Sequence, residues 1–300
     1  MRAKVSILLA LSIISIPATA SASLNGKEDF SEPRIMAVSM TKVIGSTPWA
    51  NGSGYLYSPR IIFSAGHMKD QGESTKYYVS QPNQKLKKDM ESVNVIKIFY
   101  PDSYNRKTFA DDFSIIVLEK PLAKIAPAPL VTRELLARAI SDKTPMKITG
   151  YGVYQDKCLE IKKAPPCNSV GDRTSLVPRS SLMTPWSASE IRDQFNQYQE
   201  EVADHLFMTA PYKGGPCGGD SGGSTTVLID GISYYVGTVP SGFWNAYACG
   251  QSAGVKGVTL GYTAPVYKFL DLIAKAEKYV AEHPYSPPKA TSKQSTSKKS

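Results

Sequence analysis

The chain has 300 residues, of which 42% are hydrophobic and 20% are charged, and its formal net charge is +9 at pH 7. A positive charge by itself does not identify a partner. It can favour anionic polymers or membrane surfaces, but it also describes the solvated exterior of a soluble protein, which is the interpretation we favour. No segment resembles a nucleic-acid-binding motif, so we expect no nucleic-acid partner.

The first 22 residues have the pattern of a secretory signal peptide. Basic residues lie at the start, apolar residues follow at 5–16, and small residues lead up to Ala22. The apolar stretch is shorter than the roughly 18 to 20 residues of a membrane-spanning helix, and no later stretch is long enough either. We therefore expect a soluble mature protein outside the cytoplasm, secreted or periplasmic, with no membrane span.

Short β-rich runs separated by turn residues follow the signal peptide. They are Ile35–Met40, Tyr55–Tyr57, Ile61–Phe63, Val93–Tyr100, Phe113–Leu118 and Met146–Tyr151. Thr225–Ile229 and Ile232–Val239 flank Asp230-Gly231 and predict a hairpin, because Asp-Gly supplies the positive φ angles of a type I′ turn. Many short strands and few helices predict an all-β barrel or sandwich.

Two helices are predicted. Ser187 with Glu190 resembles a capping box that opens a polar helix through Glu200. Near the end, apolar residues at helical spacing predict a helix over about 265–282 that docks on a barrel: Val266, Phe269, Leu270, Ile273 and Ala276. Residues 283–300 are rich in Pro, Ser, Lys and Thr and predict a basic, disordered tail.

The most informative run is Cys-Gly-Gly-Asp-Ser-Gly-Gly at 217–223. Its glycines permit a tight turn in which the amides of Gly219 and Ser221 converge on a developing oxyanion. Ser221 is therefore a candidate nucleophile. Taken alone, such a run is more often a loop.

A serine nucleophile needs a general base and a group that orients the base. Of the three histidines, His205 lies in a polar segment and His283 beside the tail, whereas His67 ends the apolar run 61–66. Asp112 precedes the apolar run 113–118 and is the natural orienter. A histidine after a strand can be merely structural, and Asp112 can merely cap a strand. The pattern is accidental only if both are true and the glycine-rich run is also just a loop.

The order of three motifs resembles the chymotrypsin/trypsin family of serine proteases: Ser-Ala-Gly-His at 64–67, Asp-Asp-Phe-Ser-Ile-Ile-Val-Leu at 111–118 and Gly-Asp-Ser-Gly-Gly at 219–223. His67 and Asp112 are 45 positions apart, against about 45 in the chymotrypsin template. The serine also fits the Gly-x-Ser-x-Gly elbow of α/β-hydrolases. That fold needs its acid and histidine after the serine, and the only later histidine is His283.

The resemblance implies an all-β fold of two six-stranded antiparallel β-barrels with the active site in the cleft between them and a C-terminal helix. The protease domain would cover 23–282, with the first barrel at about 35–130 and the second at about 146–265. Gly150-Tyr151-Gly152 resembles the Gly-Trp-Gly run of the family at the start of the second barrel.

By resemblance, the protein is a secreted serine endopeptidase that works through an acyl-enzyme, with His67 as base, Asp112 as orienter and Ser221 as nucleophile. The resemblance implies no cofactor and no metal. Partners would be a protein or peptide substrate and a protein inhibitor, and we expect a monomer. Two alternatives stay open: a proteolytically inactive binding protein on the same fold, and a zymogen that needs a further activating cleavage.

Specificity and activation also follow from the resemblance. Gly215 stands where trypsins carry the Asp that selects Lys and Arg, and Gly242 resembles a pocket-wall glycine, so the P1 residue is not expected to be Lys or Arg. In the family, a newly cut N-terminal amine pairs with the acid before the nucleophile, here Asp220. Ser23-Leu24-Asn25-Gly26 is the best match to that terminus, so signal removal itself is expected to create it.

The four cysteines of an exported chain favour disulfides and admit three connectivities. Cys158 and Cys167 bracket a short loop, and Cys217 and Cys249 resemble the family bridge beside the specificity pocket, which predicts these two pairs. The cysteine that often follows the base histidine is Met68 here, and its partner near residues 52–54 is missing too. The joint absence suggests a simplified, bacterial member of the family.

Overall fold

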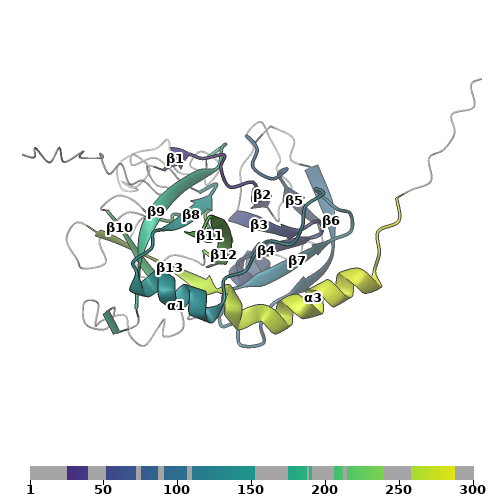
Figure 1. The fold of residues 1–300 in the computed structure, drawn as a ribbon. Helices are drawn as coiled ribbons and strands as arrows, with labels where there is room; N and C mark the ends of the chain where they lie inside the picture. The colour runs from purple at the N-terminus through teal and green to yellow at the C-terminus, as the bar shows by residue number, and fades with distance from the viewer. Residues whose placement is uncertain are drawn as a thin grey trace, which may run out of the picture.

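The computed structural model describes residues 26–39, 52–71, 76–86, 91–106, 110–152, 175–187, 189–190, 206–211, 215–239 and 258–287. Two β-barrels stand next to each other, and in the view of Figure 1 the C-terminal helix runs beneath the first of them. The expected signal peptide and most of the expected tail lie outside the described residues.

The first barrel closes in the strand order β2-β3-β4-β7-β6-β5. Its strands are β2 (Ile35–Ser39), β3 (Gly52–Ser58), β4 (Ile61–Ser64), β5 (Lys76–Val79), β6 (Glu91–Phe99) and β7 (Ser114–Leu118). Along β7, Ile116 and Leu118 join one apolar cluster, while Ile115 and Val117 join another that also includes residues of the second barrel. Because neighbouring side chains of a strand point to opposite faces, this uninterrupted apolar run reflects burial on both faces.

The second barrel is built from β8 (Met146–Gly150), β9 (Arg179–Trp186), β10 (Leu206–Pro211), β11 (Ser224–Ile229), β12 (Ile232–Thr238) and β13 (Val258–Pro265). Its pairings run in the order β9-β10-β13-β12-β11-β8, and β8 pairs again with β9, which closes the ring. The short strand β1 (Lys27–Glu28) adds to β9. The predicted all-β fold of two six-stranded barrels is confirmed.

The hairpin between β11 and β12 forms at the predicted dipeptide. Asp230 has a φ of 50° and Gly231 a φ of 79°. Two successive residues in the left-handed region give the twist that matches the flanking antiparallel strands.

Two helices pack beneath the barrels (Figure 1). The predicted C-terminal helix is α3 (Leu270–Glu282), and it is preceded by a single 3-10 turn, η6 (Val266–Phe269). The sequence did not predict α1 (Arg133–Ser141), which lies between the barrels in the chain and is capped by Thr132. Its apolar face is clear, but a nine-residue helix repeats the apolar spacing over barely two turns, which is less than the C-terminal helix offers.

The capping box expected at Ser187 forms. The backbone N–H and the hydroxyl of Ser187 both donate to Glu190 Oε2, at 2.7 and 2.8 Å. The rest of the helix predicted after it lies outside the described residues. No helix in the described ranges is long and apolar enough to cross a membrane.

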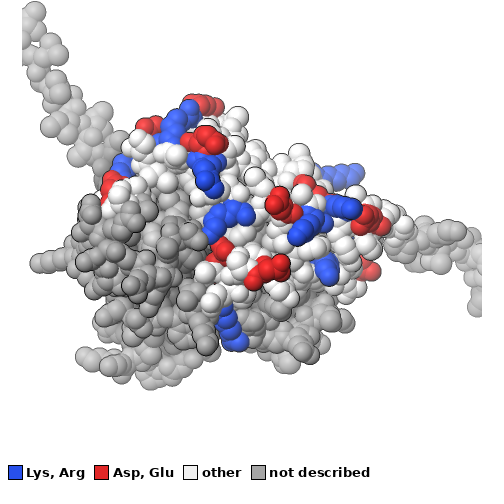
Figure 2. Space-filling model, turned by 90° about the horizontal axis from the view of Figure 1, so that it is seen from below, with Lys and Arg blue, Asp and Glu red and all other residues white. Residues whose placement is uncertain are grey.

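Charges of both signs are interspersed on the face seen from below in Figure 2. On the part of this face that the structure describes, Lys and Arg side chains alternate with Asp and Glu. The net positive charge of the chain is therefore not gathered into a single basic patch there.

The segment before β2 is fastened to the second barrel through Asp29. Its carboxylate accepts hydrogen bonds from Ser31 N at 2.7 Å and Ser180 Oγ at 2.5 Å, and Lys147 Nζ lies 3.3 Å away. Burial by itself raises the pKa of Asp29, but the two serines and the positive charge of Lys147 outweigh burial and lower the pKa to about 2.

This arrangement predicts acid-dependent stability. Because the folded-state pKa of Asp29 lies below the ordinary 3.8, its contribution is present above that pH and is lost as the pH falls toward about 2. We expect Asp29→Asn to lower the free energy of unfolding by about 1 kcal/mol near neutral pH, and by less at each step below pH 4. Denaturant unfolding across this pH range measures the difference. A difference that stays constant with pH contradicts the account; Asp230→Asn, in an exposed ion pair with Arg138, is the control with little effect.

Candidate active site

His67 lies just after the end of a buried strand, β4. All four residues of β4 are buried, and the chain then enters the 3-10 turn η1 (Gly66–Gln71), of which His67 is the second residue. Gly66 leaves room here, since a Cβ at this position would lie 3.2 Å from Asp112 Oδ1 and 3.2 Å from the Tyr104 ring. The strand therefore brings the imidazole directly beside Asp112.

Asp112 holds His67 through both of its carboxylate oxygens. Oδ1 accepts the His67 backbone N–H at 2.7 Å, and Oδ2 lies 2.7 Å from His67 Nδ1. Asp112 is fully buried, whereas the His67 side chain is 14% exposed. With Nδ1 donating to a carboxylate, Nε2 is the nitrogen that can accept a proton from a neighbour.

Strand pairing explains why two residues 45 positions apart meet. β4 and β7 are antiparallel and pair Ser64 with Ser114, so the end of β4 lies against the start of β7. His67 follows the first strand closely and Asp112 closely precedes the second. Ser114 adds a further tie, because its hydroxyl donates to the Ala65 carbonyl at 3.0 Å.

Ser221 lies in a tight turn, with its side chain neither buried nor fully exposed. Asp220 N donates to Cys217 O at 2.9 Å, and Gly223 N donates to Asp220 O at 2.7 Å. Gly219 has a φ of 92°, in the region that favours glycine.

Ser53 of β3 fastens this turn to the first barrel. Its backbone N–H donates to the Ser221 carbonyl at 2.7 Å, and its hydroxyl donates to the Gly219 carbonyl at 2.9 Å. The Ser53 hydroxyl also accepts Tyr151 N at 2.9 Å, which adds the residue directly after β8 to the junction. The serine-bearing turn of the second barrel is therefore locked onto the barrel that carries His67 and Asp112.

The trypsin family model matches residues 33–273 of the chain. The chain belongs to the trypsin family. The match spans both barrels and includes His67, Asp112 and Ser221. Because this is a family of serine proteases, membership supports a hydrolase that acts on proteins or peptides.

Gly222 brings the serine turn of this trypsin-family protein against the strand that leads to His67. A Cβ at Gly222 would lie 2.1 Å from the Ser53 carbonyl oxygen, 2.3 Å from Ser64 Oγ and 3.1 Å from Ala65 N. Its φ of 84° is also unfavourable for any other residue. The close approach of the two barrels beside Ser221 thus requires glycine.

We expect Gly222→Ala to destabilise the protein by about 1–3 kcal/mol and to reduce activity, since backbone must move to admit the methyl group. The matched control is Gly218→Ala in the same turn, where a Cβ would have nothing within 4 Å. Thermal unfolding and a peptidase assay compare the two variants. Equal stability of both would show that the barrels do not approach this closely at Gly222.

The carboxylate of Asp220 is buried and accepts hydrogen bonds from backbone N–H groups. It is fully buried, Oδ1 accepts Gly152 N at 2.8 Å and Oδ2 accepts Cys217 N at 2.9 Å. A Cβ on Gly150 would lie 2.3 Å from Oδ1 of Asp220, and one on Gly152 would lie 2.5 Å from its Cγ. Glycine is therefore needed at both ends of the Gly-Tyr-Gly run, because any side chain there would collide with the Asp220 carboxylate.

Several predicted residues are only partly placed. Gly215 is buried with a φ of 110°, and Cys217 is disulfide-bonded. Gly242, Cys158, Cys167 and Cys249 lie outside the described residues, so both cysteine pairings and the pocket wall stay predictions. The amides of Gly219 and Ser221 also stay a prediction as the oxyanion hole.

Met68 occupies the place where many trypsin-family members carry a cysteine. Its side chain is 1% exposed, and a Cβ on Gly52 would lie 2.6 Å from its Cε. Methionine therefore packs against the bare backbone of β3 near the position where the partner cysteine is missing.

Sequence reasoning missed two residues of the site. Ser53 anchors the serine turn, and Ser114 ties the two strand ends together. Ser53 sits between two glycines, which signals close backbone contact but not the identity of the contact. Among the described residues, no cluster of His, Cys, Asp or Glu is suited to hold a metal ion.

Proposed function

We propose that the protein is an exported serine endopeptidase in which Ser221, His67 and Asp112 form the catalytic triad. The observation that carries the proposal is the double hydrogen bond of buried Asp112 to His67, at 2.7 Å through each carboxylate oxygen. This contact fixes the tautomer and the orientation of the imidazole, which is the task of the acid in a triad. The hydrogen bond from Ser53 N to the Ser221 carbonyl supports placement of the nucleophile against the barrel that carries His67.

In the proposed reaction, Ser221 Oγ attacks the scissile carbonyl carbon while its proton passes to His67 Nε2. The carbonyl oxygen becomes an oxyanion that accepts hydrogen bonds from the amides of Gly219 and Ser221, each worth about 2.7–4 kcal/mol in a well-studied protease. The C–N bond then breaks, and the leaving amine takes the proton from His67. Water then attacks the acyl carbonyl carbon and gives a proton to His67, the bond from this carbon to Ser221 Oγ breaks, and Ser221 takes the proton back from His67.

We also propose an uncharged primary specificity pocket. Gly215 carries no carboxylate, so the pocket gives a Lys or Arg side chain no ionic partner at this position. Incubation of the mature protein with a mixture of peptides, followed by mass spectrometry, tests this. We expect cleavage after apolar or aromatic residues. Cleavage confined to Lys and Arg would contradict the pocket assignment, and no cleavage by a folded protein would favour the inactive binding protein or a zymogen.

For activation, we propose that signal removal exposes Ser23 and that its amine pairs with Asp220. Two observations support this. Gly26 is buried, and its carbonyl accepts a hydrogen bond from Arg179 Nη1, so the chain is already held close to the second barrel three residues after Ser23. Cleavage after Arg34 would instead make Ile35 the first residue, but Ile35 is fully buried in β2. N-terminal sequencing of the exported protein is expected to give Ser23, and a start at Ile35 would contradict the proposal.

A further inference from the structure

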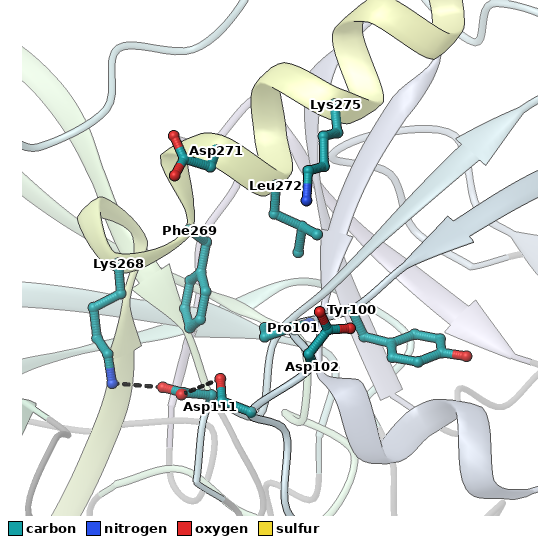
Figure 3. Close-up of a pocket in the computed structure, with 10 residues that line it drawn as sticks. Tyr100, Pro101, Asp102, Asp111, Lys268, Phe269, Asp271, Leu272 and Lys275 are labelled. Atoms are coloured by element: carbon teal, nitrogen blue, oxygen red, sulfur yellow. Dashed lines mark hydrogen bonds and ion pairs between the residues drawn. The ribbon is translucent and has the colours of Figure 1, made fainter.

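The two residues that flank Asp112 are each held by the 3-10 turn η6 that precedes the C-terminal helix. Lys268 Nζ forms an ion pair with Asp111 Oδ1 at 2.5 Å, and the Phe269 ring stacks on Phe113 with centroids 4.5 Å apart and planes 2° apart. Figure 3 shows Lys268 and Phe269 reaching from this turn toward the loop that carries Asp111. Asp112 thus lies between two side-chain contacts to consecutive residues of η6.

The backbone at this point is tightly turned. Asp111 has a φ of 50°, in the left-handed region, and Phe113 N donates to Asp111 O at 2.7 Å. That hydrogen bond closes a three-residue turn centred on Asp112. The direction in which the Asp112 carboxylate leaves the chain therefore depends on the conformation of Asp111.

The side chain of Asp111 is restrained from two sides. Ser103 Oγ donates to Oδ2 at 2.6 Å, while Lys268 holds Oδ1. The side chains of Asp111 and Lys268 are only 14% and 22% exposed. A partly buried ion pair is screened less by solvent than an exposed one, so this contact can restrain the backbone.

An open cavity of about 200 Å³ lies beside the ion pair. Other charged residues line it, namely Asp102, Asp271 and Lys275 (Figure 3). Lys275 lines the same cavity from the helix that follows Lys268. A substitution of Lys275 therefore removes a positive charge from nearly the same surroundings and serves as a control for a substitution of Lys268.

We propose that Lys268 is a positioning residue for Asp112. By fixing Asp111 in its left-handed conformation, Lys268 sets the turn that aims the Asp112 carboxylate at His67. This inference rests on the proposed triad. It assigns the 3-10 turn η6, which leads into the C-terminal helix, a role in catalysis in addition to packing, and it connects that turn to Asp112 through Asp111.

The test replaces Lys268 by methionine, which keeps the unbranched side chain up to its last atom and removes the charge. We expect kcat to fall about tenfold with KM nearly unchanged, because a small misplacement of a catalytic group reduces the rate and not substrate binding. Lys268→Arg, which retains the cation, is expected to recover most of the activity. Lys275→Met is the matched control and is expected to behave as wild type.

A second measurement does not need turnover. The Nδ1 proton of His67, hydrogen-bonded to Asp112, is expected to give a far-downfield proton NMR signal that broadens or shifts in Lys268→Met and stays in Lys275→Met. If the wild type shows this signal but does not hydrolyse peptides, the proposed function fails while the positioning role is still tested. An unchanged signal and unchanged kcat in a folded Lys268→Met variant would overturn the inference. Asp111→Asn, at a position where Asn tolerates the left-handed region, is expected to reproduce the effect and provides a second variant if Lys268→Met does not fold.

Discussion

Replacement of Ser221 by alanine is expected to lower kcat for peptide hydrolysis by about 10⁶-fold and to leave KM nearly unchanged. The substitution removes the attacking oxygen. It leaves the turn intact, because backbone hydrogen bonds and Ser53 hold the turn and none of these contacts uses the Ser221 hydroxyl. The folded protein is therefore expected to keep its stability. Steady-state kinetics on a cleaved reporter peptide, with unfolding measured in parallel, gives both quantities.

Ser233→Ala provides the control for that experiment. Ser233 lies exposed on β12, outside the site. We expect the Ser233→Ala variant to hydrolyse the reporter peptide at the wild-type rate. A Ser221→Ala variant that retains more than a thousandth of the wild-type rate would point to a different nucleophile or to a contaminating protease.

Replacement of Asp112 by asparagine is expected to lower kcat by about 10⁴-fold. Asparagine can still accept the His67 backbone N–H, but its amide group can present a donor to Nδ1 and so favour the wrong imidazole tautomer. The comparison with Asp111→Asn is informative, because the two residues are neighbours and only Asp112 contacts His67 in the proposed role. Kinetics near neutral pH measure the effect.

The expected order is a large loss for Asp112→Asn and a loss of about tenfold for Asp111→Asn. An Asp112→Asn variant within tenfold of the wild type would show that Asp112 does not orient the base. Equal large losses for both variants would instead indicate that either substitution disrupts the whole turn.

The parts of the structure that sequence predicted best are those fixed by local chemistry. Asp230-Gly231 gave the hairpin because few other dipeptides accept two positive φ angles. The buried run of β7 was readable because a strand covered on both faces has no polar interruption. The meeting of His67 with Asp112 was predicted from motif order and resemblance, and the register of β4 with β7 now gives its physical cause.

Other features depend on contacts that no local pattern announces. Lys268 lies 157 positions from Asp111, and nothing near either residue in sequence marks the pair. Ser53 likewise meets Gly219 across 166 positions. Helix α1 was missed because it is short: Leu135, Leu136, Ala139 and Ile140 do form an apolar face against the core, but in nine residues that spacing repeats only once.

The most direct test of the central claim is fluorophosphonate labelling of the purified protein without residues 1–22, with the adduct located by mass spectrometry. If Ser221 is an activated nucleophile, the label attaches to Ser221, and both Ser221→Ala and His67→Ala abolish it. Absence of label on a folded, correctly processed chain, or a label on another residue, would contradict the proposed triad.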